Sequence, residues 1–158
     1  MPELKDKSIG IILYFRFPRS TKYLILKHKK GHWSFAKGHK EKQESDIQTA
    51  SRELHEEAGI DEVKFLSRKI LLTEKYTYIN KNKMKVQKEV DYFIAESKTI
   101  KTRVDEKEIV GYKWSTLKGA EKVLTYKQSK TILKKASIII NKKSSVKTDG
   151  EQTYEQNL

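Results

Sequence analysis

The strongest constraint on this chain is a pattern of fixed residues between positions 38 and 60. It consists of Gly38, five residues, Glu44, seven residues, and then the run Arg52-Glu53-Leu54-His55-Glu56-Glu57-Ala58-Gly59-Ile60. At average residue usage, a random chain of this length would show such a pattern with odds on the order of 10⁻⁷. Whatever fold the chain adopts has to place these residues for a common purpose.

Residues 46–58 predict a helix, because the segment contains neither Gly nor Pro. At about 100° per residue, Ile47, Ala50, Leu54 and Ala58 form one apolar stripe along it. Gly59 predicts a left-handed cap at the end of the helix.

Three glutamates, Glu53, Glu56 and Glu57, share the face next to this stripe, since spacings of three and four bring helical side chains together. Like charges this close repel each other, so the arrangement indicates a divalent cation bound by hard oxygen ligands, either Mg²⁺ or Mn²⁺. Arg52 can reach back to Glu44 and orient the carboxylates. A solvated acidic face is the alternative, but it gives no reason for the fixed glycines.

The pattern is identified as the box that defines the Nudix hydrolases, and the match is complete. This resemblance implies an α/β protein with the Nudix fold, a mixed β-sheet sandwiched between α-helices. It implies a metal-dependent hydrolase that cleaves a diphosphate linkage in a nucleoside diphosphate joined to another group. The implied metal ligands are the Gly38 carbonyl with Glu53, Glu56 and Glu57, and either Glu56 or Glu53 is the implied general base.

Shorter segments resemble one group within that family, the asymmetric diadenosine tetraphosphate hydrolases. They are His32-Trp33-Ser34-Phe35-Ala36-Lys37-Gly38-His39 before the box, Glu108-Ile109-Val110-Gly111-Tyr112-Lys113-Trp114, and Leu124-Thr125-Tyr126-Lys127. The second segment makes Glu108 a further candidate metal ligand. Phosphate oxygens or a nucleobase are the expected partners of His32, Lys37, His39, Tyr78, Lys83 and Tyr126.

The chain also departs from this group. Ala36 stands where a proline usually precedes Lys-Gly, and Lys42-Gln43 stands where Pro-Gly is common. Without that glycine, Gln43 is expected to turn the loop at positive φ, at a cost of about 1 kcal/mol.

The order of the remaining segments predicts one domain over residues 1–141. Strands are expected at residues 8–17, 22–29, 84–95 and 110–115, with extended segments within 63–78. Ser115 or Thr116 can cap a helix that starts near Leu117, and a last helix is expected from Tyr126 to about Ile139. Residues 142–158 are polar and predict a disordered tail.

Composition agrees with one soluble enzyme domain: the chain has 158 residues, no cysteine and a net charge of +13. This charge attracts polyanions, so nucleotides are the expected partners and RNA is a possible one, although a lysine-rich composition alone would explain the charge. No apolar run is long enough for a membrane span and no signal peptide is apparent, so a cytoplasmic protein is expected.

Two alternatives stay open at this point. The first keeps the chemistry and changes the substrate, to RNA 5′-triphosphate ends or to nucleoside triphosphates removed in house-cleaning. The second is a nucleotide- or RNA-binding module that has lost catalysis. The presence of every box carboxylate weighs against the second alternative.

Overall fold

A mixed β-sheet forms the centre of the computed structural model, which describes residues 3–157 and side chains as far as Lys143. Strands β1 (Leu4–Phe17) and β7 (Lys85–Ser97) pair in parallel in the middle, and the order along the sheet is β3-β2-β1-β7-β5. The other strands join this path by antiparallel pairing, with β4 on β1, β6 on β7 and β8 on β2. Their bounds are β2 (Ser20–His28), β3 (Trp33–Ser34), β4 (Ala36–Gly38), β5 (Val63–Phe65), β6 (Leu72–Ile79) and β8 (Ile109–Ser115).

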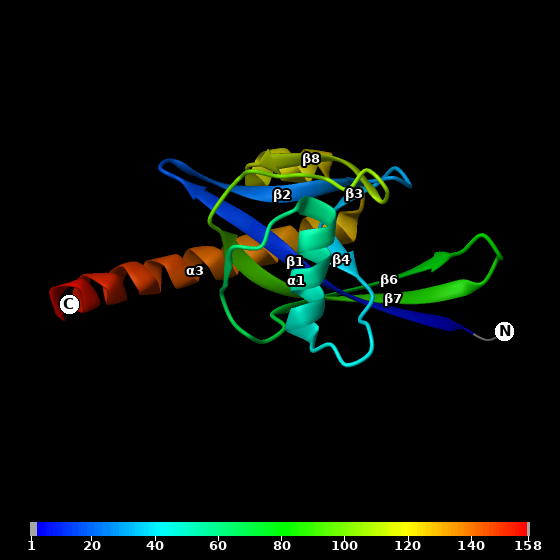
Figure 1. Cartoon of the computed structure of the whole chain (residues 1–158), viewed down its shortest axis with the longest axis horizontal. Helices are drawn as coiled ribbons and strands as arrows, with labels where there is room; N and C mark the ends of the chain where they lie inside the picture. The colour runs from blue at the N-terminus through cyan, green and yellow to red at the C-terminus, as the bar shows by residue number, and fades with distance from the viewer. Residues whose placement is uncertain (1–2, 158) are drawn as a thin grey trace.

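Helices cover both faces of the sheet: α1 (Asp46–Ala58) on one side, α2 (Leu117–Val123) and α3 (Lys127–Asn157) on the other (Figure 1). Side chains of a strand alternate between faces, so β1 contributes to two cores. Ile9 and Ile11 pack in the cluster that contains Leu54 of α1, whereas Ile12 packs in the cluster that contains Leu133 of α3. The predicted mixed sheet between helices is confirmed.

The helix of the box and its two ends follow the predictions from sequence. Ser45 caps α1 in a reciprocal pair of hydrogen bonds with Gln48. At the other end, Gly59 adopts φ 67° and its N–H donates to the His55 carbonyl. Gln43 adopts φ 68°, as expected for a residue that stands where a glycine is common. The loop therefore keeps the turn without the glycine.

The last two helices differ in how well they were predicted. Thr116 caps α2, as one of the two expected residues, and its hydroxyl accepts from the Gly119 N–H at 3.1 Å. The expected end of α3 near Ile139 is wrong, because the helix continues to Asn157 and leads away from the sheet (Figure 1). No proline interrupts this segment. Among the described residues, no helix is both long and apolar enough to cross a membrane.

The boundary of the domain near Asn141 stays a prediction, since side chains beyond Lys143 lie outside the described ones. Deleting residues 142–158 should lower the melting temperature by no more than about 4 °C. The only described contact at stake is the one between the Lys143 ammonium and the Leu66 carbonyl, and an exposed hydrogen bond contributes about 1 kcal/mol. Thermal melts should compare this deletion with one of residues 144–158, which keeps Lys143. A loss of about 10 °C in both would show that the tail packs on the domain.

Candidate active site

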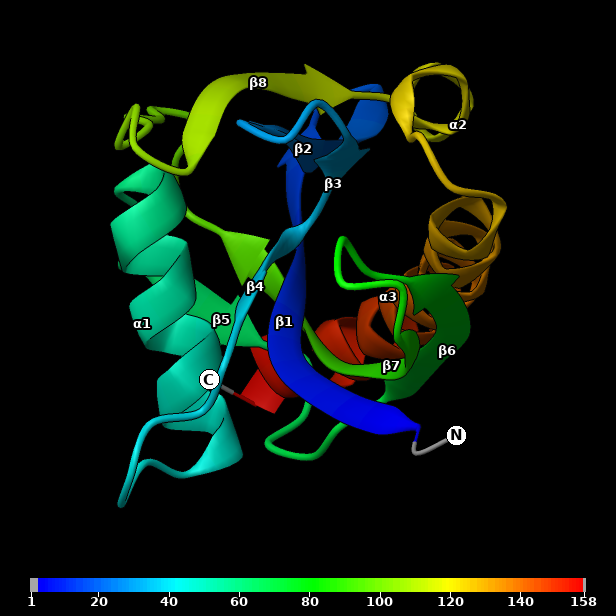
Figure 2. The ribbon, with the colours of Figure 1, turned by 90° about the vertical axis from the view of Figure 1, so that its right-hand side faces the viewer.

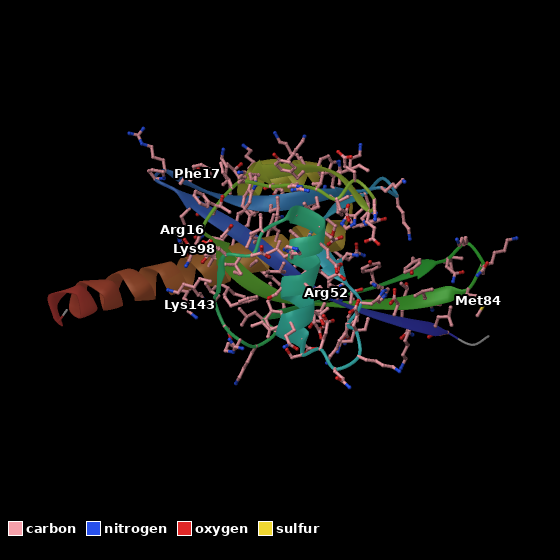
Figure 3. The ribbon with its side chains drawn as sticks, in the orientation of Figure 1. Arg16, Phe17, Arg52, Met84, Lys98 and Lys143 are labelled. Carbon is pink, nitrogen blue, oxygen red and sulfur yellow. The ribbon has the colours of Figure 1, made fainter. Side chains whose placement is uncertain are left out.

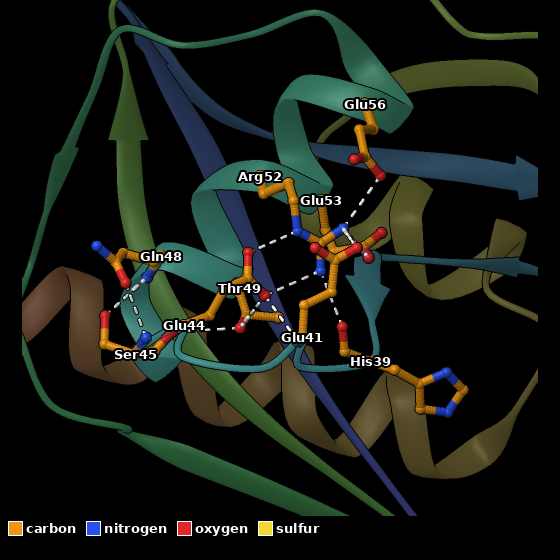
Figure 4. A network of polar contacts seen from close by, with 9 residues as sticks. All are labelled: His39, Glu41, Glu44, Ser45, Gln48, Thr49, Arg52, Glu53 and Glu56. Atoms are coloured by element: carbon orange, nitrogen blue, oxygen red, sulfur yellow. Dashed lines mark hydrogen bonds and ion pairs between the residues drawn. The ribbon is translucent and has the colours of Figure 1, made fainter.

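Arg52 of α1 is the centre of an ionic network that ties the box loop to the helix (Figure 4). Its Nε donates to Glu44 Oε2 at 2.6 Å, which confirms the expected contact between the two residues. Its Nη1 donates to Glu53 Oε1 at 2.9 Å and to Glu56 Oε2 at 3.2 Å, and its Nη2 donates to the His39 carbonyl at 2.9 Å. The hydrogen bond from Arg52 lowers the pKa of Glu44 to about 2. Arg52 therefore orients three carboxylates of the box at once.

Two glutamates of the box, Glu53 and Glu57, are almost fully buried, with 7% and 2% of their surface exposed. The carboxylate of Glu53 lies directly against Gly38, where an added Cβ would overlap it. Glu57 Oε1 accepts a hydrogen bond from the backbone N–H of Lys37 at 2.9 Å. The fixed glycine of the box is thus required by the close approach of a carboxylate.

The buried acids of α1 share an unfavourable electrostatic environment with Glu108. Burial, helped by the charges of Glu53 and Glu108, raises the pKa of Glu57 to about 8 against the lowering effect of Lys37. Burial also raises the pKa of Glu53 against the lowering effect of Arg52. Glu108 reaches this place because the Asp105 carboxylate accepts three backbone N–H groups in the preceding turn. An open depression of about 690 Å³ is lined by Glu56, Glu57, Glu108, Asp105, Arg103 and Lys107, among others.

The donor set fits a divalent metal ion in chemistry, though it is not a closed ligand cage. Among the described residues, no three Asp, Glu or His side chains come close enough together to hold an ion as they stand. Arg52 instead engages Glu53 and Glu56. Carboxylates with a neighbouring carbonyl are nevertheless the oxygen ligands that Mg²⁺ and Mn²⁺ prefer, and a cation would offset the repulsion among the buried acids.

A row of aromatic side chains forms a second half of the site, on β6 and next to the start of α3. Figure 2 shows these two elements on the other side of strand β4 from α1. The rings of Tyr76 on β6 and Tyr126, just before α3, lie nearly parallel, with centroids 6.3 Å apart and an interplanar angle of 22°. On one side, the ring centroid of His32 lies 5.7 Å from that of Tyr126. On the other side, the ring centroid of Tyr78 lies 6.2 Å from that of Tyr76. The structure therefore brings together three of the predicted substrate contacts, His32, Tyr78 and Tyr126, around Tyr76.

Lys37 connects the acidic half with the aromatic half. Burial and the charge of Lys88 lower the pKa of Lys37, while Glu57 from one half and Glu74 from the other raise it. Glu74 is itself buried on β6 and accepts from the Ser129 hydroxyl of α3 at 3.2 Å. The Lys37 ammonium therefore interacts electrostatically with one carboxylate from each half of the site.

Of the two other predicted contacts, Lys83 is remote from the box and His39 lies beside it. Lys83 sits in the turn between β6 and β7 at φ 60°; its neighbour Met84 is at the far end of this hairpin, well away from Arg52 (Figure 3). His39 follows the box glycine, but its ring is exposed and contacts Asp6 at 2.6 Å. Lys88, Glu74 and Asp6 also lie at the site. They were not predicted, because no local spacing in the sequence links them to the box.

The model of the NUDIX domain matches residues 6–135. The chain is 32% identical over 137 residues to the asymmetrical bis(5′-nucleosyl)-tetraphosphatase of Sus scrofa, which covers 80% of this chain and 90% of that protein. Its identity to the Rattus norvegicus protein of the same name is 29% over 136 residues, with the same coverage.

Solved structures agree with these relatives. The binary complex of a C. elegans Ap4A hydrolase superimposes with a TM-score of 0.73 at 26% identity, covering 86% of this chain and 98% of that one. The NUDIX domain of Shewanella oneidensis NrtR, complexed with ADP ribose, has a TM-score of 0.69 at 14% identity and covers 86% of this chain and 88% of that one. At that identity the second likeness shows the fold alone.

Proposed function

Because the chain belongs to the Nudix family of pyrophosphohydrolases, we propose that it hydrolyses dinucleoside polyphosphates and that diadenosine tetraphosphate is its preferred substrate. The observation that carries this proposal is the pair formed by Tyr76 and Tyr126. A base between two rings needs about 7 Å, twice the contact distance of about 3.5 Å between carbon atoms. The ring centroids are 6.3 Å apart, which is less than this span, so one ring has to move outward to admit a purine.

The box carboxylates are proposed to bind a metal ion at the other end of the substrate, away from the tyrosine pair. Nudix hydrolases generally use divalent metal ions, and we assign Mg²⁺ or Mn²⁺ to the Gly38 carbonyl with Glu53, Glu56, Glu57 and Glu108. When bound, such an ion lowers the pKa of an attacking water and offsets charge on the phosphate oxygens. Arg52 holds Glu53 and Glu56 in place through its forked hydrogen bonds.

Either Glu56 or Glu53 is the proposed general base. Glu56 is the more accessible of the two, since its side chain is 50% exposed and that of Glu53 only 10%. Glu53 packs on the backbone of Gly38 and is held by Arg52, which suits a ligand better than a group that has to accept a proton from water. The geometry therefore favours Glu56 as the base.

We propose that the phosphate chain of the substrate lies between the acidic and aromatic halves, over a floor formed by Lys37 and Lys88. Lys88 is only 7% exposed and Lys37 is partly buried, and burial together with the charge of Lys88 lowers the pKa of Lys37. An anion between two such ammonium groups relieves their repulsion. His32 lies beside Tyr126 and its pKa is lowered to about 4, chiefly by burial, so it is neutral at pH 7 and offers one N–H donor.

One incubation tests this proposal. The protein should be given diadenosine tetraphosphate, nucleoside triphosphates and RNA with a 5′-triphosphate, each in Mg²⁺ and in excess chelator, and the products identified by chromatography. We expect ATP and AMP from the dinucleotide, and no product in chelator. Preferential release of pyrophosphate from RNA would instead support the RNA alternative, which the net charge of +13 favours. Undiminished turnover in chelator would exclude the metal mechanism.

A cytoplasmic location stays a prediction.

A further inference from the structure

Asp6 is far from the box in sequence but contacts two different parts of the candidate site. It lies on the outer half of β1, directly opposite Lys88 in the parallel pairing of β1 with β7. One carboxylate oxygen, Oδ1, lies 2.6 Å from Nε2 of His39, and the other, Oδ2, accepts from the Lys88 ammonium at 2.8 Å. A single carboxylate therefore joins strand β7 to the loop of the box.

The Lys88 ammonium is held by more than Asp6. It also donates to the Ser8 hydroxyl at 2.6 Å, and only 7% of the residue is exposed. Lysine side chains have several rotatable bonds and lose rotamer entropy when they are fixed. The two short contacts come from Asp6 and Ser8, which lie two residues apart on the same face of β1, and they specify one rotamer. This rotamer places the charge of Lys88 near Lys37.

The His39 contact reaches the box carboxylates through the backbone. The His39 carbonyl accepts from Arg52 Nη2 at 2.9 Å, and the same guanidinium binds Glu53 and Glu56. Burial would raise the pKa of the Asp6 carboxyl, but the hydrogen bonds of Lys88 and His39 outweigh this and lower it, so the carboxylate is charged at neutral pH.

We propose that Asp6 is a positioning residue for the phosphate chain, because its carboxylate fixes the Lys88 ammonium and the loop at His39 in one arrangement. This inference rests on the proposed function only in taking Lys37 and Lys88 as the floor of the phosphate site. Asp6 itself touches no substrate. Its negative charge alone disfavours an anion nearby, so positioning and simple electrostatics predict opposite effects when the charge is removed.

The test is anion binding without turnover. Calorimetric titration with adenosine 5′-tetraphosphate in excess chelator should show about 3- to 10-fold weaker binding by Asp6→Asn than by the wild type, a coupling typical of residues that share a hydrogen bond. Asp6→Ala serves as a second variant. The matched control is Asp61→Asn, which breaks an equally short contact of 2.6 Å with His55 at the exposed end of α1, and it should bind like the wild type.

A double-mutant cycle shows whether Asp6 acts through Lys88. In a Lys88→Met background, Asp6→Asn should change the dissociation constant less than about 2-fold. An additive loss, or tighter binding by Asp6→Asn alone, would overturn the positioning role. The titration needs neither metal nor hydrolysis. Its result therefore holds even if the dinucleotide proves not to be the substrate, and the substrate panel tests the proposed function independently.

Discussion

Replacing Glu57 by Gln should lower kcat by about 10²-fold or more without unfolding the protein. Glu57 is buried against the box loop, and its Oε1 accepts from the Lys37 N–H. The glutamine oxygen can accept the same hydrogen bond, so the local fold persists. The variant lacks the negative charge that a divalent ion requires from its ligand. Steady-state kinetics across a range of Mg²⁺ concentrations, together with a thermal melt, measure both effects.

Glu62→Gln is the matched control for this experiment, because Glu62 is exposed just beyond the same helix. Its kcat should equal that of the wild type. If Glu57→Gln keeps full activity with an unchanged requirement for Mg²⁺, Glu57 is not a ligand and the metal site has to be built from the other carboxylates.

Tyr126→Ala should raise KM for diadenosine tetraphosphate about 5- to 100-fold while kcat changes little. Stacking on a base contributes about 1–3 kcal/mol, and it is made equally in the ground state and the transition state when the base is remote from the reacting phosphorus. Tyr126→Phe should keep most of the affinity, since stacking needs the ring and not the hydroxyl group. Kinetic measurement of KM and kcat for both variants tests the pairing with Tyr76.

Tyr112→Ala provides the comparison, because Tyr112 on β8 is 43% exposed and Tyr126 is 46% exposed, so both truncations remove a similar ring from the surface. Only the Tyr126 variant should bind the dinucleotide more weakly. A fall in melting temperature with no change in KM would mean that Tyr126 supports the entry into α3 rather than the substrate.

The parts of the site that could be predicted from sequence depend on spacing within one segment. The helix of the box, its Gly59 cap, the positive φ of Gln43 and the contact of Arg52 with Glu44 all follow from helical periodicity or from local backbone preferences. Each of these features involves residues separated by no more than about two turns of helix plus one loop.

The parts that could not be predicted depend on strand register. Asp6 meets Lys88 only because β1 and β7 pair in parallel at one register. A shift of β7 by one residue would turn Lys88 to the other face of the sheet, away from Asp6. Glu74 reaches Ser129 because β6 packs near the start of α3. The extension of α3 was missed for another reason, since its polar composition favours disorder in isolation.

Strand β1 contributes to both hydrophobic cores, and this has a consequence for local unfolding of the protein. Alternate residues of this strand belong to the core beneath α1 and to the core beneath α3. If either helix detaches, one face of β1 becomes exposed while the other helix still covers the opposite face. Local fluctuations should therefore be confined to the hairpin tips and helix ends, and the innermost amides of β1 and β7 should exchange with solvent only when the whole domain unfolds. In hydrogen exchange, residues 9–13 and 90–95 should then share one protection free energy, equal to the global stability, although they lie on strands more than half the chain apart.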